Sequence, residues 1–133
     1  MFSDASRPLY EVKANLFKGL AHPLRVRVLE VLAASADDTP VSELLDATGL
    51  EASHLSQHLA VLRNYGLVTA ERRGNQVRYR LAYPQVADLL RVARALLAEI
   101  LQTTERQLVE QSALPELAPV TAMTDAAADR ARS

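Results

Sequence analysis

The sequence predicts a mainly helical protein of five helices that carries one small β-hairpin, and three observations support this fold class. Apolar residues recur at helical spacing in four stretches before residue 66 and in one long stretch after residue 84. Between them, residues 68–81 change to a period of two, which is typical of strands. Glycine and proline stand at the boundaries of these stretches, where helices are expected to begin or end.

The overall composition is that of one ordinary globular domain. At 133 residues the chain is long enough for a single core, and its 49% hydrophobic and 23% charged residues are average values. The lack of cysteine excludes a disulfide framework, a thiolate metal site and a thiol redox switch. No apolar run approaches the ~20 residues that span a bilayer, and the start lacks a secretion signal pattern. These features predict a cytoplasmic protein with no membrane partner.

The first two helices are separated by a proline. Residues 1–7 are expected to form a flexible leader, and Pro8 suits the first position of a helix that ends near Leu20. The apolar stripe of this helix consists of Leu9, Val12, Leu16, Phe17 and Leu20. His22 is pushed out of the α region by the proline that follows it, so it is expected to be a local cap or hydrogen-bond partner. A second helix then starts at Pro23.

A turn at residues 36–40 precedes a short third helix and a longer fourth one. The third helix spans Val41 to Thr48 and stops at Gly49, and the fourth is ended by Gly66 as a left-handed cap. One face of the fourth helix is a leucine stripe, formed by Leu55, Leu59 and Leu62. The opposite face is small and polar and lacks a carboxylate; it consists of Ser53, Gln57, Ala60 and Asn64, with Ser56 at its edge.

Two alternating segments after Gly66 predict a β-hairpin with a basic tip. Residues 68–71 and 77–81 alternate between apolar and polar side chains. Between them, residues 72–76 (RRGNQ) contain the glycine and asparagine that supply positive φ in a tight turn. Two short helices joined by a turn and followed by such a hairpin, or wing, form a winged helix-turn-helix.

The last predicted helix has more apolar surface than a small domain needs. It starts at Pro84 and keeps one apolar face through about Leu108. This face predicts a partner, most simply an identical helix across a two-fold axis; the alternative is a helix that folds back onto its own domain. The residues expected to dimerise are Leu9, Val12, Leu16, Leu89, Ala93, Leu96, Leu97 and Ile100. The domain is expected to cover residues 8–110, followed by a disordered tail at 111–133.

Several of these segments resemble one bacterial family. The runs VSELLDATGLEASHLSQHLAVLRNYGLV, RRGNQVRYRL and LAHPLRVRVLEVL are similar to the ArsR (ArsR/SmtB) family of dimeric winged helix-turn-helix repressors. The likeness covers roughly residues 8–105, and the opening segment together with the lack of cysteine is closest to actinobacterial members. The resemblance implies a homodimer built through the first and last helices, which binds double-stranded DNA.

Both the charge distribution and the polar helix face favour DNA binding. The net charge is −1, but residues 51–80 hold five arginines and only two carboxylates. A two-fold dimer would place two copies of the fourth helix in successive major grooves of an inverted repeat. Base-edge contacts are expected from Ser53, Ser56 and Gln57, with His54 at the flank. Phosphate or minor-groove contacts are expected from Arg72, Arg73, Asn75 and Arg78, while Arg63 either binds phosphate or caps its helix.

Neither metal site that is familiar in the family matches this chain. One uses a cysteine pair in the third helix, and cysteine is absent. The other uses Asp-x-His and His-x-x-Glu in the last helix, where this chain has Tyr83, Gln85, Leu96 and Glu99. The spacing of His54 and His58 permits chelation, but a hydrogen-bonding role within the helix-turn-helix is favoured. No metal or cofactor is therefore predicted, and the effector is unassigned.

Three other functions are less well supported. A winged-helix protein-interaction module would have the same fold, with an incidental basic hairpin. A metal-responsive repressor would need a site that matches no known pattern. An enzyme would need a reaction site, but the chain has no Cys-His pair and no glycine-rich phosphate loop, and its carboxylates are scattered. A DNA-binding regulator without catalytic activity is the favoured prediction.

Overall fold

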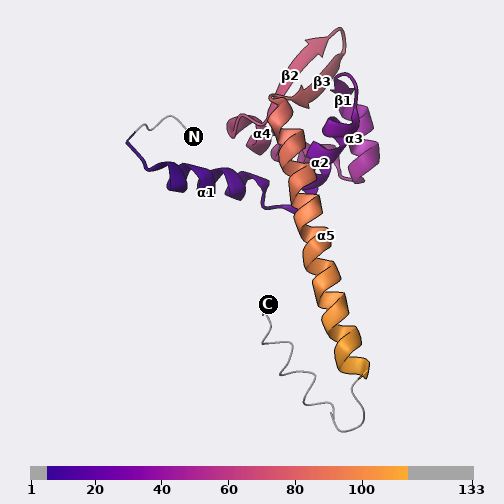
Figure 1. The fold of residues 1–133 in the computed structure, drawn as a ribbon. Coiled ribbons are helices and arrows are strands. Elements are labelled where there is room, and N and C mark those ends of the chain that lie inside the picture. The colour runs from indigo at the N-terminus through magenta and orange to yellow at the C-terminus, as the bar shows by residue number, and fades with distance from the viewer. Residues whose placement is uncertain (1–5, 114–133) are drawn as a thin grey trace. The chain divides into compact units, whose positions relative to one another are not determined.

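The computed structural model describes residues 6–113, which form five helices and three strands (Figure 1). The helices are α1 (Leu9–Leu20), α2 (Pro23–Ala34), α3 (Val41–Thr48), α4 (Ala52–Asn64) and α5 (Pro84–Ala113). The strands are β1 (Thr39–Pro40), β2 (Val68–Arg73) and β3 (Gln76–Leu81). The predicted five-helix winged fold is therefore confirmed. Most of the predicted leader and tail, at residues 1–5 and 114–133, lie outside the described residues.

The core lies where α2, α3 and α4 meet the sheet. Its fully buried members come from the leucine stripe of α4 and from facing positions on α2 and α3, namely Val28, Leu29, Leu44, Leu55, Leu59 and Leu62. Val86 adds the first turn of α5 to the same cluster. His22 caps α2 as predicted, because its Nδ1 atom accepts a hydrogen bond of 3.1 Å from the backbone N–H of Leu24.

The sheet contains a strand that the sequence did not predict. Thr39–Pro40, expected to be part of a turn, pairs with Tyr79 and Arg78 as an antiparallel edge strand, so the strand order is β1-β3-β2. A two-residue strand is too short to show a period of two. Pro40 is compatible with this place because an edge strand can lack a backbone donor. The wing is consequently fastened to the segment that precedes α3.

Gly66 ends α4 in the predicted way. Its φ of 75° lies in the left-handed region, and the N–H of Leu67 donates back to the carbonyl of Leu62 at 3.0 Å. This geometry turns the chain directly into β2. The spacing between the polar face of α4 and the wing is therefore fixed by a tight connection.

The helix α5 extends to Ala113, past the apolar face that runs to about Leu108 and into the tail predicted from residue 111. Residues 85–114 contain neither glycine nor proline, so nothing in this segment ends a helix. Residues 111–113, predicted to begin the tail, are helical. The chain divides within α5 into two compact units, one up to Leu90 and one from Arg91. No helix in residues 6–113 is both long and apolar enough to cross a membrane.

Gly19 permits a close approach between α1 and the end of α4. It is buried, and a Cβ atom added there would lie 2.6 Å from Cγ of Tyr65. Helix propensity alone predicts that Gly19→Ala stabilises the protein by up to about 1 kcal/mol. Because Cγ is the fixed base of the ring, we expect overpacking to dominate and the variant to lose about 1–2 kcal/mol of unfolding free energy.

Urea unfolding of Gly19→Ala, alone and combined with Tyr65→Ala, measures this effect. The clash predicts that Gly19→Ala costs much less when the ring is already absent. An equal cost in both backgrounds would contradict a role for Tyr65.

Candidate nucleic-acid interface

The polar face of α4 is exposed, as its sequence pattern predicted. Ser53, His54, Ser56 and Gln57 are all exposed, whereas the leucine stripe behind them is buried. The helix Ala52–Asn64 has no acidic residue in its first turn or elsewhere. Short hydroxyl and amide groups on a rigid, carboxylate-free helix are suited to donor and acceptor groups on base edges. The structure thus brings together the four residues predicted to read DNA.

Among the described residues, Arg63 and Arg72 have guanidinium groups that make no hydrogen bond or ion pair. Arg63 is exposed in the last turn of α4, and Arg72 is exposed near the tip of the wing. The alternative in which Arg63 caps a backbone carbonyl of α4 is therefore not seen in residues 6–113. Free, exposed guanidinium groups are available for phosphate.

Two other wing arginines are held by the protein itself. Nη2 of Arg73 lies 3.1 Å from Oδ2 of Asp38 and 3.6 Å from Oε1 of Glu71. Nη2 of Arg78 donates to the backbone carbonyl of Asp38 at 2.9 Å, and its Nη1 donates to Oε1 of Gln76 at 3.0 Å. From the sequence, both arginines were expected to contact DNA together with Arg72. No local pattern indicated a contact with Asp38, which lies forty positions before Arg78.

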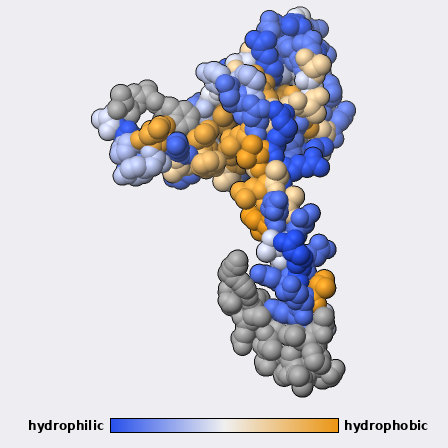
Figure 2. All heavy atoms as spheres, viewed as in Figure 1, coloured by the Kyte–Doolittle hydropathy of each residue, from blue (hydrophilic) through white to orange (hydrophobic). Residues whose placement is uncertain are grey.

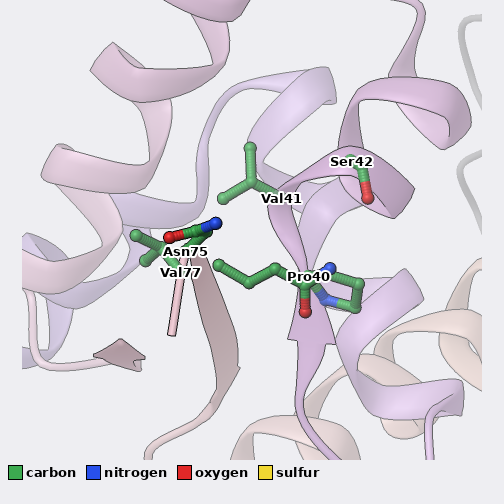
Figure 3. A pocket seen from close by; sticks show the side chains of 6 residues that line it. Pro40, Val41, Ser42, Asn75 and Val77 are labelled. Atoms are coloured by element: carbon green, nitrogen blue, oxygen red, sulfur yellow. The ribbon is translucent and has the colours of Figure 1, made fainter. Parts of the chain in front are cut away.

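The remaining wing residue, Asn75, lines a hollow of about 340 Å³ between the wing turn and the start of α3. Figure 3 shows Asn75 and Val77 on the wing side, and Pro40, Val41 and Ser42 on the opposite side, at the end of β1 and the start of α3. Apolar side chains make up much of the wall. Asn75 lines this hollow and is exposed.

Apolar side chains are exposed on both helices predicted to dimerise (Figure 2). On α1, Leu9 is exposed, whereas Val12 and Leu16 are half-buried and Leu16 packs on the core. On α5, Leu89 is half-buried, and every side chain at residues 91–106 is exposed. Those predicted for the interface include Ala93, Leu96, Leu97 and Ile100, the last three each at least half exposed. On α5, an exposed apolar stripe of this kind marks an interaction surface.

The histidines pair in an unexpected way. The rings of His22 and His58 lie 4.3 Å apart between centroids, so α4 is in contact with the cap of α2. Burial lowers the pKa of His58 below its ordinary 6.5, and nearby positive charge on His22, Arg25 and His54 lowers it further. No group of three or more His, Cys, Asp or Glu side chains within residues 6–113 is arranged to hold a metal ion.

The lowered pKa of His58 predicts stability that falls in mild acid. Below about pH 6.5 the unfolded chain binds more protons at this residue than the folded chain, so stability rises with pH across that window. Urea unfolding at about pH 5.5 and about pH 7.5 should show lower stability at the acid value, and His58→Gln should reduce the difference. The control His54→Gln removes an exposed imidazole from the same helix and should leave the difference in place. An unchanged pH dependence in His58→Gln would contradict the assignment.

Comparisons with known proteins agree with this geometry. Residues 22–70 match the family described as bacterial regulatory protein, arsR family. The chain is 53% identical over 97 residues to the uncharacterized HTH-type transcriptional regulator Rv0081 of Mycobacterium tuberculosis, which covers 72% of this chain and 83% of the relative.

Two solved structures are also similar. The crystal structure of Rv0081 has a TM-score of 0.65 at 52% identity and covers 73% of this chain and 96% of that chain. The solution structure of the homodimeric winged helix-turn-helix DNA-binding domain of Mb0332 from Mycobacterium bovis has a TM-score of 0.65 at 30% identity and covers 77% and 95%. The sequence, the fold and these relatives agree: the chain belongs to the ArsR family of bacterial winged helix-turn-helix transcriptional regulators.

Proposed function

We propose that the chain is a homodimeric repressor that binds an inverted repeat in double-stranded DNA and acts in the cytoplasm. The observation that carries the proposal is the exposed, carboxylate-free face of α4, which is backed by buried leucines and followed at once by a basic wing. The family to which the chain belongs consists of regulators with this domain. Similar solved structures include a homodimeric DNA-binding domain and a transcriptional repressor.

The candidate DNA-binding residues fall into three groups, according to their exposure and their contacts within the protein. We assign base-edge contacts to Ser53, Ser56 and Gln57, with His54 at the flank, because all four are exposed on one helix. Phosphate contacts are assigned to side chains that are exposed and free of ion pairs in residues 6–113, namely Arg63, Arg72 and Asn75. Arg73 and Arg78 are assigned to the support of the wing, since both are bonded to Asp38.

The dimer is assigned to the exposed stripe of α5 together with the exposed part of α1. Two copies of α4 must lie about 34 Å apart to enter successive major grooves, and only a fixed pairing of subunits provides that spacing. We place the regulatory domain at residues 8–110 with the tail after it, as the sequence predicted, while the helix itself continues to Ala113.

Binding to labelled DNA from upstream of its own gene, measured over rising salt, tests the proposal. A sequence-specific regulator should show a linear fall in log affinity with log salt and should prefer this DNA to a scrambled duplex. Binding that is absent or insensitive to salt would support a protein-interaction module instead.

A further inference from the structure

Asp38 holds the wing through two different groups, its carboxylate and its backbone carbonyl. Its side chain is only 5% exposed, whereas that of its partner Arg73 is 53% exposed. A buried carboxylate is stable only where partners offset its lost hydration, and Arg73 provides the charged partner at 3.1 Å. The backbone carbonyl of the same residue accepts from Arg78.

The two arginines lie on the same face of the wing. In the register of the hairpin, Glu71 pairs with Arg78 and Arg73 pairs with Gln76, so these side chains alternate with those that face the core. The sheet face here has a hollow of about 250 Å³ lined by Asp38, Thr69, Ala70, Glu71, Arg78 and Arg80. Two carboxylates, Asp38 and Glu71, therefore lie among the basic side chains of this face.

Arg72 lies on the opposite face of β2 from Arg73, because side chains alternate between the two faces along a strand. It is exposed and has no hydrogen bond or ion pair within the described part of the chain. Arg73 is about half exposed, but its charge is offset by Asp38 and Glu71. Arg72 and Arg73, although adjacent in the sequence, thus differ in the charge that they present to DNA.

We propose that Asp38 is a specificity-determining residue that holds the wing in one position and keeps the charge of Arg73 away from phosphate. The inference rests on the proposed function. A nonspecific complex forms when basic side chains neutralise whichever phosphates they can reach, without insertion of α4 into the major groove. A wing arginine freed from Asp38 strengthens such complexes, whereas the operator complex, positioned by α4, gains less. Asp38 thereby increases the ratio of operator binding to nonspecific binding.

The substitution Asp38→Asn tests this role because it removes the charge and keeps the shape. We expect stronger binding to scrambled DNA, with a salt slope steeper by about 0.9 for each wing in contact with the duplex. That change equals about a 3.5-fold additional gain per wing between about 200 mM and about 50 mM salt. Affinity for a selected operator should rise less, so the specificity ratio should fall.

Asp37→Asn is the matched control. Asp37 lies one position earlier, is exposed and accepts a hydrogen bond from the backbone N–H of Asp38, but it forms no ion pair among the described residues. That hydrogen bond, with Arg73 and Arg78 nearby, lowers its pKa, so it carries the same charge close to the same arginines. We expect a smaller change in the salt slope than in Asp38→Asn.

The role of Arg73 gives a second measurement that does not depend on Asp38→Asn folding. In the parent protein, Arg73→Ala should leave the salt slope unchanged, whereas Arg72→Ala should flatten it by about 0.9 per wing. In the Arg73→Ala background, Asp38→Asn should no longer steepen the slope.

The inference is overturned by equal shifts in Asp38→Asn and Asp37→Asn, by a gain that persists without Arg73, or by a flatter slope in Arg73→Ala alone. A parent protein that shows no salt-dependent binding to any DNA would instead overturn the proposed function. The two failures are therefore distinguishable.

Discussion

Leu97→Glu is expected to convert the proposed dimer to a monomer and to abolish operator binding. Leu97 lies at the centre of the apolar stripe of α5, where it is 53% exposed in the single chain, and a two-fold partner would bury it. A charge buried without a partner costs about 3–5 kcal/mol, which corresponds to about a 10²- to 10⁴-fold loss of dimer affinity. Operator binding requires two copies of α4 at a fixed spacing, so loss of the dimer should also lower the affinity for the operator.

Ala95→Glu is the matched control for this change. It introduces the same charge two positions earlier, on the opposite side of the same helix, at another exposed residue. Glutamate is a good helix former, so neither variant should break α5. Sedimentation should report a monomer for Leu97→Glu and a dimer for Ala95→Glu. A Leu97→Glu protein that remains dimeric would show that this stripe is not the interface.

Gln57→Ala is expected to remove discrimination at one base pair of each half-site. Gln57 is exposed in the middle of the polar face of α4, and an amide in the major groove pairs best with adenine. Loss of one such contact costs about 1–3 kcal/mol, or about 5- to 150-fold for the preferred base. Affinity for operators already altered at that position should change little.

Affinity for a panel of single-base operator variants measures the effect of Gln57→Ala. Arg72→Ala is the contrasting variant, since loss of a phosphate contact weakens all operators equally. A uniform loss across the panel in Gln57→Ala would assign this residue to the backbone and not to a base.

Most of the fold follows from local signals in the sequence. Positive φ at Gly49 and Gly66 ends α3 and α4, and Pro23 and Pro84 open α2 and α5. The strand β1 could not be predicted, because a two-residue strand has no period and its partner lies about forty positions away. The predicted tail begins at residue 111, whereas α5 continues to Ala113, because a helix can extend beyond its apolar stripe.

The polar face of α4 and the wing, the two halves of the candidate site, differ in whether local sequence signals predict them. The exposure of Ser53 and Gln57 follows from helical period, since residues opposite a buried leucine stripe must face outward. The division of the wing arginines does not, because it depends on Asp38, a residue brought to the wing only by the pairing of β1 with β3. Local pattern therefore located the helix face, whereas long-range pairing decides the charge that the wing presents.

Selection of bound duplexes from random DNA by the purified protein tests directly whether the chain reads DNA as a symmetric dimer. A dimer that presents two copies of α4 should enrich an inverted repeat whose half-sites are centred about 10 base pairs apart or at a multiple of one helical turn. Gln57→Ala should lose its preference at one position of each half. Enrichment of a single half-site without symmetry, or no enrichment at all, would contradict a dimer that reads DNA with two copies of α4.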